Sequence, residues 1–314
     1  MSEGQIKPPP RLEGLAPGIM SFVLWGFLPV YWKFLGAVPA LQILAHRIFW
    51  SFVFLVILVA VTGRFQQLRE EAKSLAINRK RRLGVFLAAG FITFNWGLFI
   101  WAVNDGRLVE TSLGYYINPL VNVLVGVTVL RERLSLWQFL AVILAAVGVV
   151  YLTVDYGSLP WVALSLATSM TLYSLCKKVA GLTAISGLLI ETTILAPLAA
   201  LYFVLIYSQG QGYPPGLNLT FILLIGAGVT TAVPLLLFAH ALNRLSLTLM
   251  GVIQYLSPTL TLMLGVVVYG EAFTRPFQVA FGFTWAALLL FTTARLPFMI
   301  KLENSLLKLL RPRR

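Results

Sequence analysis

The feature that most constrains the fold of this chain is a series of long apolar segments separated by short polar turns. A helix needs about 20 mostly apolar residues to cross the hydrocarbon core of a bilayer. Because backbone polar groups in lipid must be satisfied within the segment, helices are the expected spanning form. We therefore expect an all-α integral membrane protein with ten transmembrane helices. The ten segments lie at about residues 15–36, 40–62, 83–103, 109–130, 134–153, 158–180, 184–207, 219–242, 246–270 and 275–296.

The distribution of positive charge predicts the orientation in the membrane. If the spans alternate from a cytoplasmic N-terminus, 20 of the 24 lysines and arginines lie in cytoplasmic segments, including seven between Arg64 and Arg82. The outer loops then keep only Arg107 and Arg275. Such a bias predicts that both termini are cytoplasmic. A basic inner surface facing anionic lipids also explains the net charge of +13 without a nucleic-acid partner.

The two ends of the chain lie outside the apolar segments. Residues 1–14 hold three prolines and no apolar core, so we expect a flexible cytoplasmic N-terminus and no cleavable signal peptide. Residues 297–314 place Leu302, Leu306 and Leu309 at helical spacing among basic residues. This pattern predicts a basic amphipathic helix on the inner leaflet.

An internal repeat divides the membrane region into two units of five spans. Shifting the sequence by 139 residues brings Pro119 onto Pro258 and Gly126 onto Gly265, within a longer register that joins spans three to five with spans eight to ten. Because five is odd, the second unit enters the membrane from the opposite side. Inverted repeats are typical of secondary transporters, which bind solute near the midplane between the repeats. The two predicted domains are residues 15–153 and 158–296.

Polar residues recur on matching helix faces in the two units. Polar groups facing lipid are costly, so these faces are expected to border a central cavity. The alternative is that they hydrogen-bond to neighbouring helices. Pro119 and Pro258 each remove a backbone hydrogen bond and are candidate hinges. The candidate cavity residues are Tyr115, Asn118 and Asn122 in span four, and Gln254, Tyr255 and Ser257 in span nine.

Aromatic side chains accompany a carboxamide in two further spans. Trp25 and Tyr31 flank a proline in span one, and Asn95 and Trp96 lie in the middle of span three. Such rings suit a pocket for a partly apolar solute. Ordinary aromatic packing between helices is the alternative.

Four charged residues fall within or at the ends of the expected spans: Lys33, Arg47, Glu110 and Glu191. Ionisable groups inside a membrane are candidates for solute binding or coupling. Lys33 can also reach the headgroups, and Glu110 suits a helix N-terminus. Arg47 and Glu191 hold equivalent places in the two repeats, but their Cα atoms differ in depth by about 12 Å. Local pairs, Arg47 with Glu110 and Glu191 with Lys177, are the alternative.

No arrangement of reactive residues predicts an enzyme or a cofactor. Cys176, His46 and His240 are scattered, so no nucleophile with its base and no metal cluster is expected. Glu132 and Glu271 recur by the same shift, but each ends a span, and a structural role at the turn is expected.

Several segments together resemble the RarD group of the EamA family, in the drug/metabolite transporter superfamily. They are WGFLPVYWK (25–33), LAHRIFWS (44–51), FNWGLFIWAVN (94–104), SLGYYINPLVNVLVG (112–126), TAVPLLLFAHALNRL (231–245) and QYLSPTL (254–260). The resemblance implies ten spans in two EamA repeats, a bacterial plasma-membrane location and transport. It implies no particular solute.

These observations lead to one functional hypothesis with one alternative. We expect a secondary transporter, monomeric or homodimeric, that moves a small organic metabolite or drug-like solute by alternating access, with proton coupling and exchange both open. The alternative is a lipid-handling protein on the same fold, either a flippase or an exporter of a lipid-linked carrier. The expected partners of the transporter are a small-molecule substrate and the lipid bilayer.

Overall fold

The computed structural model describes residues 10–130, 135–213, 216, 218–242, 244–245, 253–294 and 296–310. Within these ranges the side chains of residues 10–12, 119, 122–123, 126–130, 156, 239, 242, 304 and 306–310 are not described.

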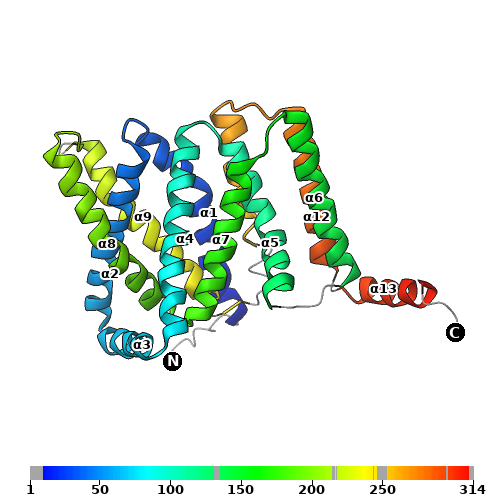
Figure 1. The fold of residues 1–314 in the computed structure, drawn as a ribbon, viewed down its shortest axis with the longest axis horizontal. Coiled ribbons are helices and arrows are strands. Elements are labelled where there is room, and N and C mark those ends of the chain that lie inside the picture. The colour runs from blue at the N-terminus through cyan, green and yellow to red at the C-terminus, as the bar shows by residue number, and fades with distance from the viewer. Residues whose placement is uncertain are drawn as a thin grey trace, which may run out of the picture.

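Every regular element in the described ranges is a helix (Figure 1). The helices are α1 (Pro10–Phe34), α2 (Ala40–Thr62), α3 (Phe65–Ile77), α4 (Arg79–Asn104), α5 (Leu108–Leu130), α6 (Leu136–Tyr156), α7 (Trp161–Ala180), α8 (Ala184–Ser208), α9 (Leu219–Leu242), α11 (Leu256–Met263), the π-helix η1 (Leu264–Val268), α12 (Arg275–Thr293) and α13 (Pro297–Leu310).

Seven of these helices are long and apolar enough to cross a membrane, judged over the described residues: α1, α2, α4, α6, α8, α9 and α12. The expected all-helical membrane class is therefore confirmed. The three other expected spans fall on α5, α7 and the pair α11–η1. The count of ten spans stays a prediction.

The helices of the bundle pack in a regular pattern. α4 lies along α7 and α1 along α9, and both α7 and α1 have a second neighbour, α5 and α11 respectively. α6 and α12 pack against each other at one edge of the bundle, while α2, α8 and α9 lie at the opposite edge (Figure 1). The largest buried side chains include Trp32, Ile43 and Ile100, which belong to the main apolar core.

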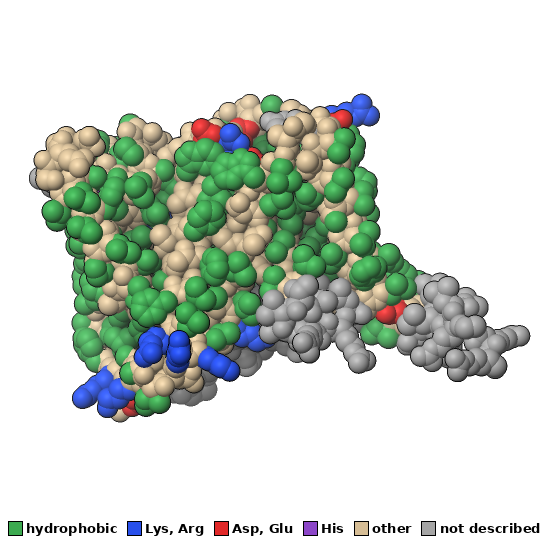
Figure 2. Space-filling view, viewed as in Figure 1, with side chains coloured by type: hydrophobic (Ala, Val, Ile, Leu, Met, Phe, Trp, Pro, Cys, Tyr) green, Lys and Arg blue, Asp and Glu red, His purple; other side chains and the backbone are tan. Residues whose placement is uncertain are grey.

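The stretch from Gly63 to Arg82, expected as a loop, contains the helix α3. Gly63 ends α2 with a positive φ of 67°, a conformation that glycine adopts without steric cost. Asn78 then starts α4, because its side chain accepts a hydrogen bond from the Arg81 N–H at 3.1 Å. Figure 2 shows lysine and arginine side chains gathered at this end of the molecule.

The ninth expected span, 246–270, is not one continuous α-helix where it is described. Residues 246–252 lie outside the described part, and α11 passes into the wider turn of η1 at Leu264. Gly265 allows a close approach there, since a Cβ at this position would lie 3.0 Å from the Leu108 Cβ. The approach brings Glu271 to the start of α5, where its Oε2 accepts a hydrogen bond from the Val109 N–H at 3.0 Å. Glu271 therefore caps the start of α5, a structural role different from the one expected at its own turn. Glu132 lies outside the described residues.

The amphipathic helix predicted within 297–314 is present as α13, which leaves the bundle beyond the end of α6 and α12 (Figure 1). Glu303 links α13 to α6, because the Glu303 Oε1 accepts a hydrogen bond of 2.7 Å from the Leu136 N–H. The Trp137 indole N–H also donates to the Met299 carbonyl at 2.9 Å.

Candidate functional site

Arg47 is the buried cation around which the candidate site is built. It lies on α2 about 11 Å along the helix axis from Ala40, and only 4% of its surface is exposed. Its Nε donates a hydrogen bond of 2.7 Å to the Thr231 hydroxyl on α9. The Thr231 hydroxyl in turn donates to the Ala227 carbonyl at 2.8 Å, so it is fixed in place as an acceptor.

Two indole rings from other helices flank the Arg47 guanidinium. Its Cζ lies 4.0 Å from the ring centroid of Trp96 on α4 and 5.2 Å from that of Trp32 on α1. Indole faces attract cations, and a desolvated contact contributes about 2 kcal/mol. These two contacts and the hydrogen bond to Thr231 restrict where the guanidinium can lie.

No acid in the described part of the chain neutralises Arg47. Among the described residues, no carboxylate oxygen lies within the 4.0 Å ion-pair distance of its nitrogens. Its two terminal nitrogens, Nη1 and Nη2, form no hydrogen bond in the same part of the chain. The indole nitrogen of Trp32 is also buried without a partner. Among the described residues, the site therefore contains donor groups that no protein acceptor engages.

A carboxamide network adjoins this site from α4, α5 and α7. Asn95, 1% exposed, donates to the Leu166 carbonyl at 3.0 Å and to the Ser169 hydroxyl at 2.9 Å. The Tyr115 hydroxyl donates to the Asn95 Oδ1 at 3.2 Å. Tyr115 is also close enough to Arg47 to interact with it electrostatically. Four sequence-predicted residues thus meet in one place: Arg47, Asn95, Trp96 and Tyr115.

Asn118 hydrogen-bonds to a neighbouring helix, which is the alternative to lining a central cavity. Its amide nitrogen donates to the Ala167 carbonyl at 2.9 Å and the Thr171 hydroxyl at 3.1 Å, both on α7. These bonds join α5 to α7. The side chains of Asn122 and Pro119 lie outside the described part.

The span-nine candidates lie on or just before α11. Gln254 and Ser257 are half-buried. Tyr255 stacks on Tyr116 with ring centroids 6.0 Å apart, beside aromatic rings of α12. The Pro258 carbonyl accepts a hydrogen bond of 2.7 Å from the Ser112 hydroxyl, which links α11 to α5.

A groove of about 580 Å³ runs between α4 and α7, lined by side chains such as Phe86, Phe94 and Thr168. It includes none of Tyr115, Asn118, Gln254 and Ser257. A central cavity bordered by those four residues stays a prediction.

The candidates of α1 contact neighbours other than Arg47. Trp25 packs against Phe22 and Phe238, with centroid distances of 5.2 and 5.5 Å. The Tyr31 hydroxyl donates to the Leu223 carbonyl. The Lys33 ammonium lies 5.2 Å from the ring centroid of Tyr269.

The alternative prediction, an ion pair of Arg47 with Glu110, is wrong. Glu110 Oε1 accepts a hydrogen bond of 3.0 Å from the Val162 N–H at the start of α7, and Oε2 lies 3.5 Å from Arg107. The free N–H groups and dipole of a helix N-terminus favour an acid, and they hold Glu110 there.

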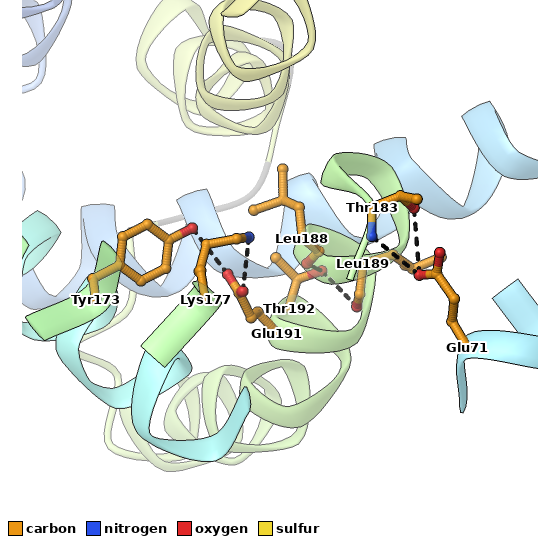
Figure 3. A network of polar contacts seen from close by, with 8 residues as sticks. All are labelled: Glu71, Tyr173, Lys177, Thr183, Leu188, Leu189, Glu191 and Thr192. Carbon is orange, nitrogen blue, oxygen red and sulfur yellow. Dashed lines mark hydrogen bonds and ion pairs between the residues drawn. The ribbon is translucent and has the colours of Figure 1, made fainter. Parts of the chain in front are cut away.

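Glu191 forms a separate buried cluster between α7 and α8 (Figure 3). Its Oε1 lies 2.9 Å from the Lys177 ammonium, and its Oε2 accepts a hydrogen bond of 3.2 Å from the Tyr173 hydroxyl. Only 2% of Glu191 is exposed. The local pair with Lys177 is therefore present, and Arg47 and Glu191 form no direct ion pair in this structure.

Comparisons with known proteins identify the family. Residues 13–154 match the EamA-like transporter family. The chain is 46% identical over 282 residues to the uncharacterised transporter YojE of Bacillus subtilis (strain 168), covering 89% of this chain and 93% of that protein. It is 42% identical over 283 residues to protein RarD of Escherichia coli (strain K12), with coverage of 89% and 93%. The chain belongs to the RarD group of the EamA-like transporter family.

Two more distant matches complete the comparison. A protein of Pseudomonas aeruginosa named chloramphenicol-sensitive protein RarD is 33% identical, over 88% of this chain and 93% of its own length. A solved crystal structure matches 91% of this chain and 99% of its own with a TM-score of 0.59. At 18% identity, this second match supports the fold alone.

Sequence reasoning missed three residues of these two clusters: Trp32, Thr231 and Tyr173. Trp32 follows Tyr31 directly and is fully buried, so its place in an aromatic-rich segment was the available signal. Thr231 and Tyr173 carried no such signal, because single threonines and tyrosines are common in membrane helices and usually bond within them. Among the described residues no group of three or more His, Cys, Asp or Glu side chains is placed to hold a metal ion.

Proposed function

We propose that this RarD-group protein is a secondary transporter that carries a small organic solute across a bacterial plasma membrane by alternating access. The Arg47 cluster is its solute site. Its named relatives in the EamA-like family are transporters, which supports the general class.

One observation carries the assignment of the site: a buried guanidinium without a carboxylate partner among the residues that the structure describes. An isolated charge in an apolar interior is costly, and proteins normally pair it or neutralise it. Retaining an unpaired Arg47 between two indole rings has an evident purpose if a solute supplies the missing partner. Side chains from α1, α2, α4, α5 and α9 meet there, as expected for a site between repeats.

The helix packing supports the two inverted repeats and hence two alternating states. In the two proposed repeats, α1 corresponds to α7, α4 to α9 and α5 to α11. The contact of α4 with α7 then has its equivalent in the contact of α9 with α1, and that of α5 with α7 has its equivalent in the contact of α11 with α1. All four contacts occur in the bundle. In this proposal the five-span units are residues 15–153 and 158–296, and both termini face the cytoplasm.

Solute exchange in vesicles tests the proposal. Purified protein is reconstituted into lipid vesicles loaded with a labelled solute, and efflux is measured with and without the same solute outside. The panel includes chloramphenicol, which the name of the Pseudomonas relative suggests. Saturable efflux that external solute accelerates supports a transporter.

The lipid-handling alternative predicts another result in the same vesicles. A fluorescent phospholipid in the inner leaflet would become accessible to an impermeant quencher only in vesicles that contain the protein. Lipid movement without exchange of any soluble compound would replace the transporter assignment.

Glu191 is the candidate for proton coupling, since it is a buried carboxylate held by Lys177 and Tyr173. Glu191→Gln keeps the shape and removes the titration. If Glu191 couples protons, accumulation driven by a pH gradient is lost while exchange at equal pH persists. Normal pH-driven accumulation by Glu191→Gln would leave Glu191 with a structural role.

A further inference from the structure

We infer that the solute bound at the Arg47 cluster is an organic anion whose carboxylate, or a similar planar oxyanion, pairs with the Arg47 guanidinium. This inference rests on the proposed function and adds the chemical class of the solute. It follows from the hydrogen-bond groups, the charge and the geometry around Arg47.

The hydrogen-bond groups of the cluster lack acceptors. Arg47 Nη1 and Nη2 form no hydrogen bond among the described residues, and neither does the buried Trp32 indole nitrogen. The nearby acceptor oxygens each take one hydrogen bond from the protein: Thr231 accepts from the Arg47 Nε, and the Asn95 Oδ1 accepts from Tyr115. A solute that brings oxygen acceptors would complete the site.

The charge of the cluster also requires an anion. Glu110 is held by the start of α7 and by Arg107, and Glu191 is held by Lys177 and Tyr173. Neither acid is within ion-pair distance of Arg47. A cationic solute would face an unpaired like charge, whereas an anion would remove the cost of burying Arg47.

The geometry favours a planar oxyanion over a point charge. The Trp96 ring lies 4.0 Å from the Arg47 Cζ, and the hydrogen bond from Nε to Thr231 holds one edge of the guanidinium. The opposite edge carries Nη1 and Nη2, the paired donors that match the two oxygens of a carboxylate. A lysine would supply the charge but not this fork. The ring of Trp96, which is 8% exposed, offers apolar surface for the remainder of the solute.

Ligand-induced stabilisation of the purified full chain tests the inference. The probes are acetate, benzoate, phenylacetate and indole-3-acetate, each compared with its own amide. We expect at least one carboxylate to raise the unfolding temperature in a concentration-dependent way, because a ligand that binds only the folded state stabilises it. The matching amide should require an at least roughly tenfold higher concentration for the same shift.

Variants separate binding at Arg47 from general effects of anions. Arg47→Gln should lose the carboxylate shift, and Arg47→Lys should weaken it about tenfold, because it keeps the charge but loses the fork. Arg64→Gln, the same change at an exposed arginine before α3, should respond as the unsubstituted protein does. Arg47→Lys also provides the test if Arg47→Gln does not show a cooperative unfolding transition.

Three results would overturn the inference. They are equal shifts by acids and amides, a carboxylate shift that survives in both Arg47 variants, and the absence of any carboxylate shift in the unsubstituted protein. None of them removes the proposed function, since exchange of neutral or cationic solutes in vesicles would still identify a transporter. Loss of all solute exchange would instead refute the proposed function.

Discussion

Substituting either partner of the buried pair of Lys177 and Glu191 should lower stability, but by unequal amounts. Removing one partner of a buried ion pair costs about 3–5 kcal/mol when the other charge is left uncompensated. The Glu191 side chain is 3% exposed and that of Lys177 is 28% exposed, so the two residues differ in what they lose. Lys177→Met leaves a carboxylate with only the Tyr173 hydroxyl as a partner. Glu191→Gln leaves an ammonium that still reaches the surface.

The structure gives the expected magnitudes. Lys177→Met should lower the free energy of unfolding by about 3 kcal/mol, the lower end of the buried-pair range. Glu191→Gln should lower it by about 1 kcal/mol, because the amide oxygen still accepts a hydrogen bond from Lys177 and the amide N–H can donate to the Tyr173 hydroxyl oxygen. The double substitution should cost less than the sum, with a coupling energy of about 1–2 kcal/mol.

Unfolding of the four proteins by sodium dodecyl sulfate in mixed micelles measures this cycle. Lys178→Met is the matched control, because Lys178 is the exposed neighbour of Lys177, and it should change stability by less than about 0.5 kcal/mol. A larger cost for Glu191→Gln than for Lys177→Met would refute the reasoning. Simple additivity of the two substitutions would do the same.

Three further predictions concern the carboxamide network, the helix cap and the topology. Asn95→Leu removes three hydrogen bonds to α5 and α7 and should lower the free energy of unfolding by about 2 kcal/mol, at about 0.6 kcal/mol for each membrane hydrogen bond. A change below about 0.5 kcal/mol would contradict this prediction. Glu271→Gln should cost about 1 kcal/mol through the lost charge at the start of α5, and Glu271→Ala about 2 kcal/mol through the lost hydrogen bond as well; equal stability of both variants with the unsubstituted protein would argue against the cap. A cysteine at Gln66, in a Cys176→Ala background that removes the single native cysteine, should react with an impermeant reagent in inside-out vesicles and not in intact cells; labelling of intact cells would reject the cytoplasmic placement of α3.

Much of the helical architecture was predictable because it depends on composition and length. Apolar runs of about 20 residues specify helices in lipid, and the ends at Ala40, Thr62 and Ala184 agree with expected boundaries. The helix α3 was not predicted, because its many charges indicate an exposed segment and conceal an amphipathic pattern. The interruption at Leu264 was not predicted, because only Gly265 marks it in the sequence and the neighbouring Leu108 of α5 is brought there by the fold.

The candidate site was predictable only in part. Arg47, Asn95 and Trp96 were found because polar and aromatic residues inside apolar segments are conspicuous. Their partners were not, because the direction of a side chain depends on how each helix is rotated about its axis. Glu110 illustrates the difference: its depth allowed a pair with Arg47, but the start of α7 lies closer and binds it.

The most direct test of the central claim is the accessibility of Thr231, the hydrogen-bond partner of Arg47, from both sides of the membrane. Thr231 is fully buried in this structure, so reagent reaches it only when the bundle opens. In a Cys176→Ala background, Thr231→Cys is treated with an impermeant thiol reagent in intact cells and in inside-out vesicles. Ser51→Cys is the control, since Ser51 is fully buried where α2 packs on α9 and bonds to the Gly228 carbonyl. Alternating access predicts labelling of the Thr231→Cys protein from both sides and no labelling of the control. Labelling of Thr231→Cys from neither side, or from one side only, would contradict an alternating solute site at Arg47.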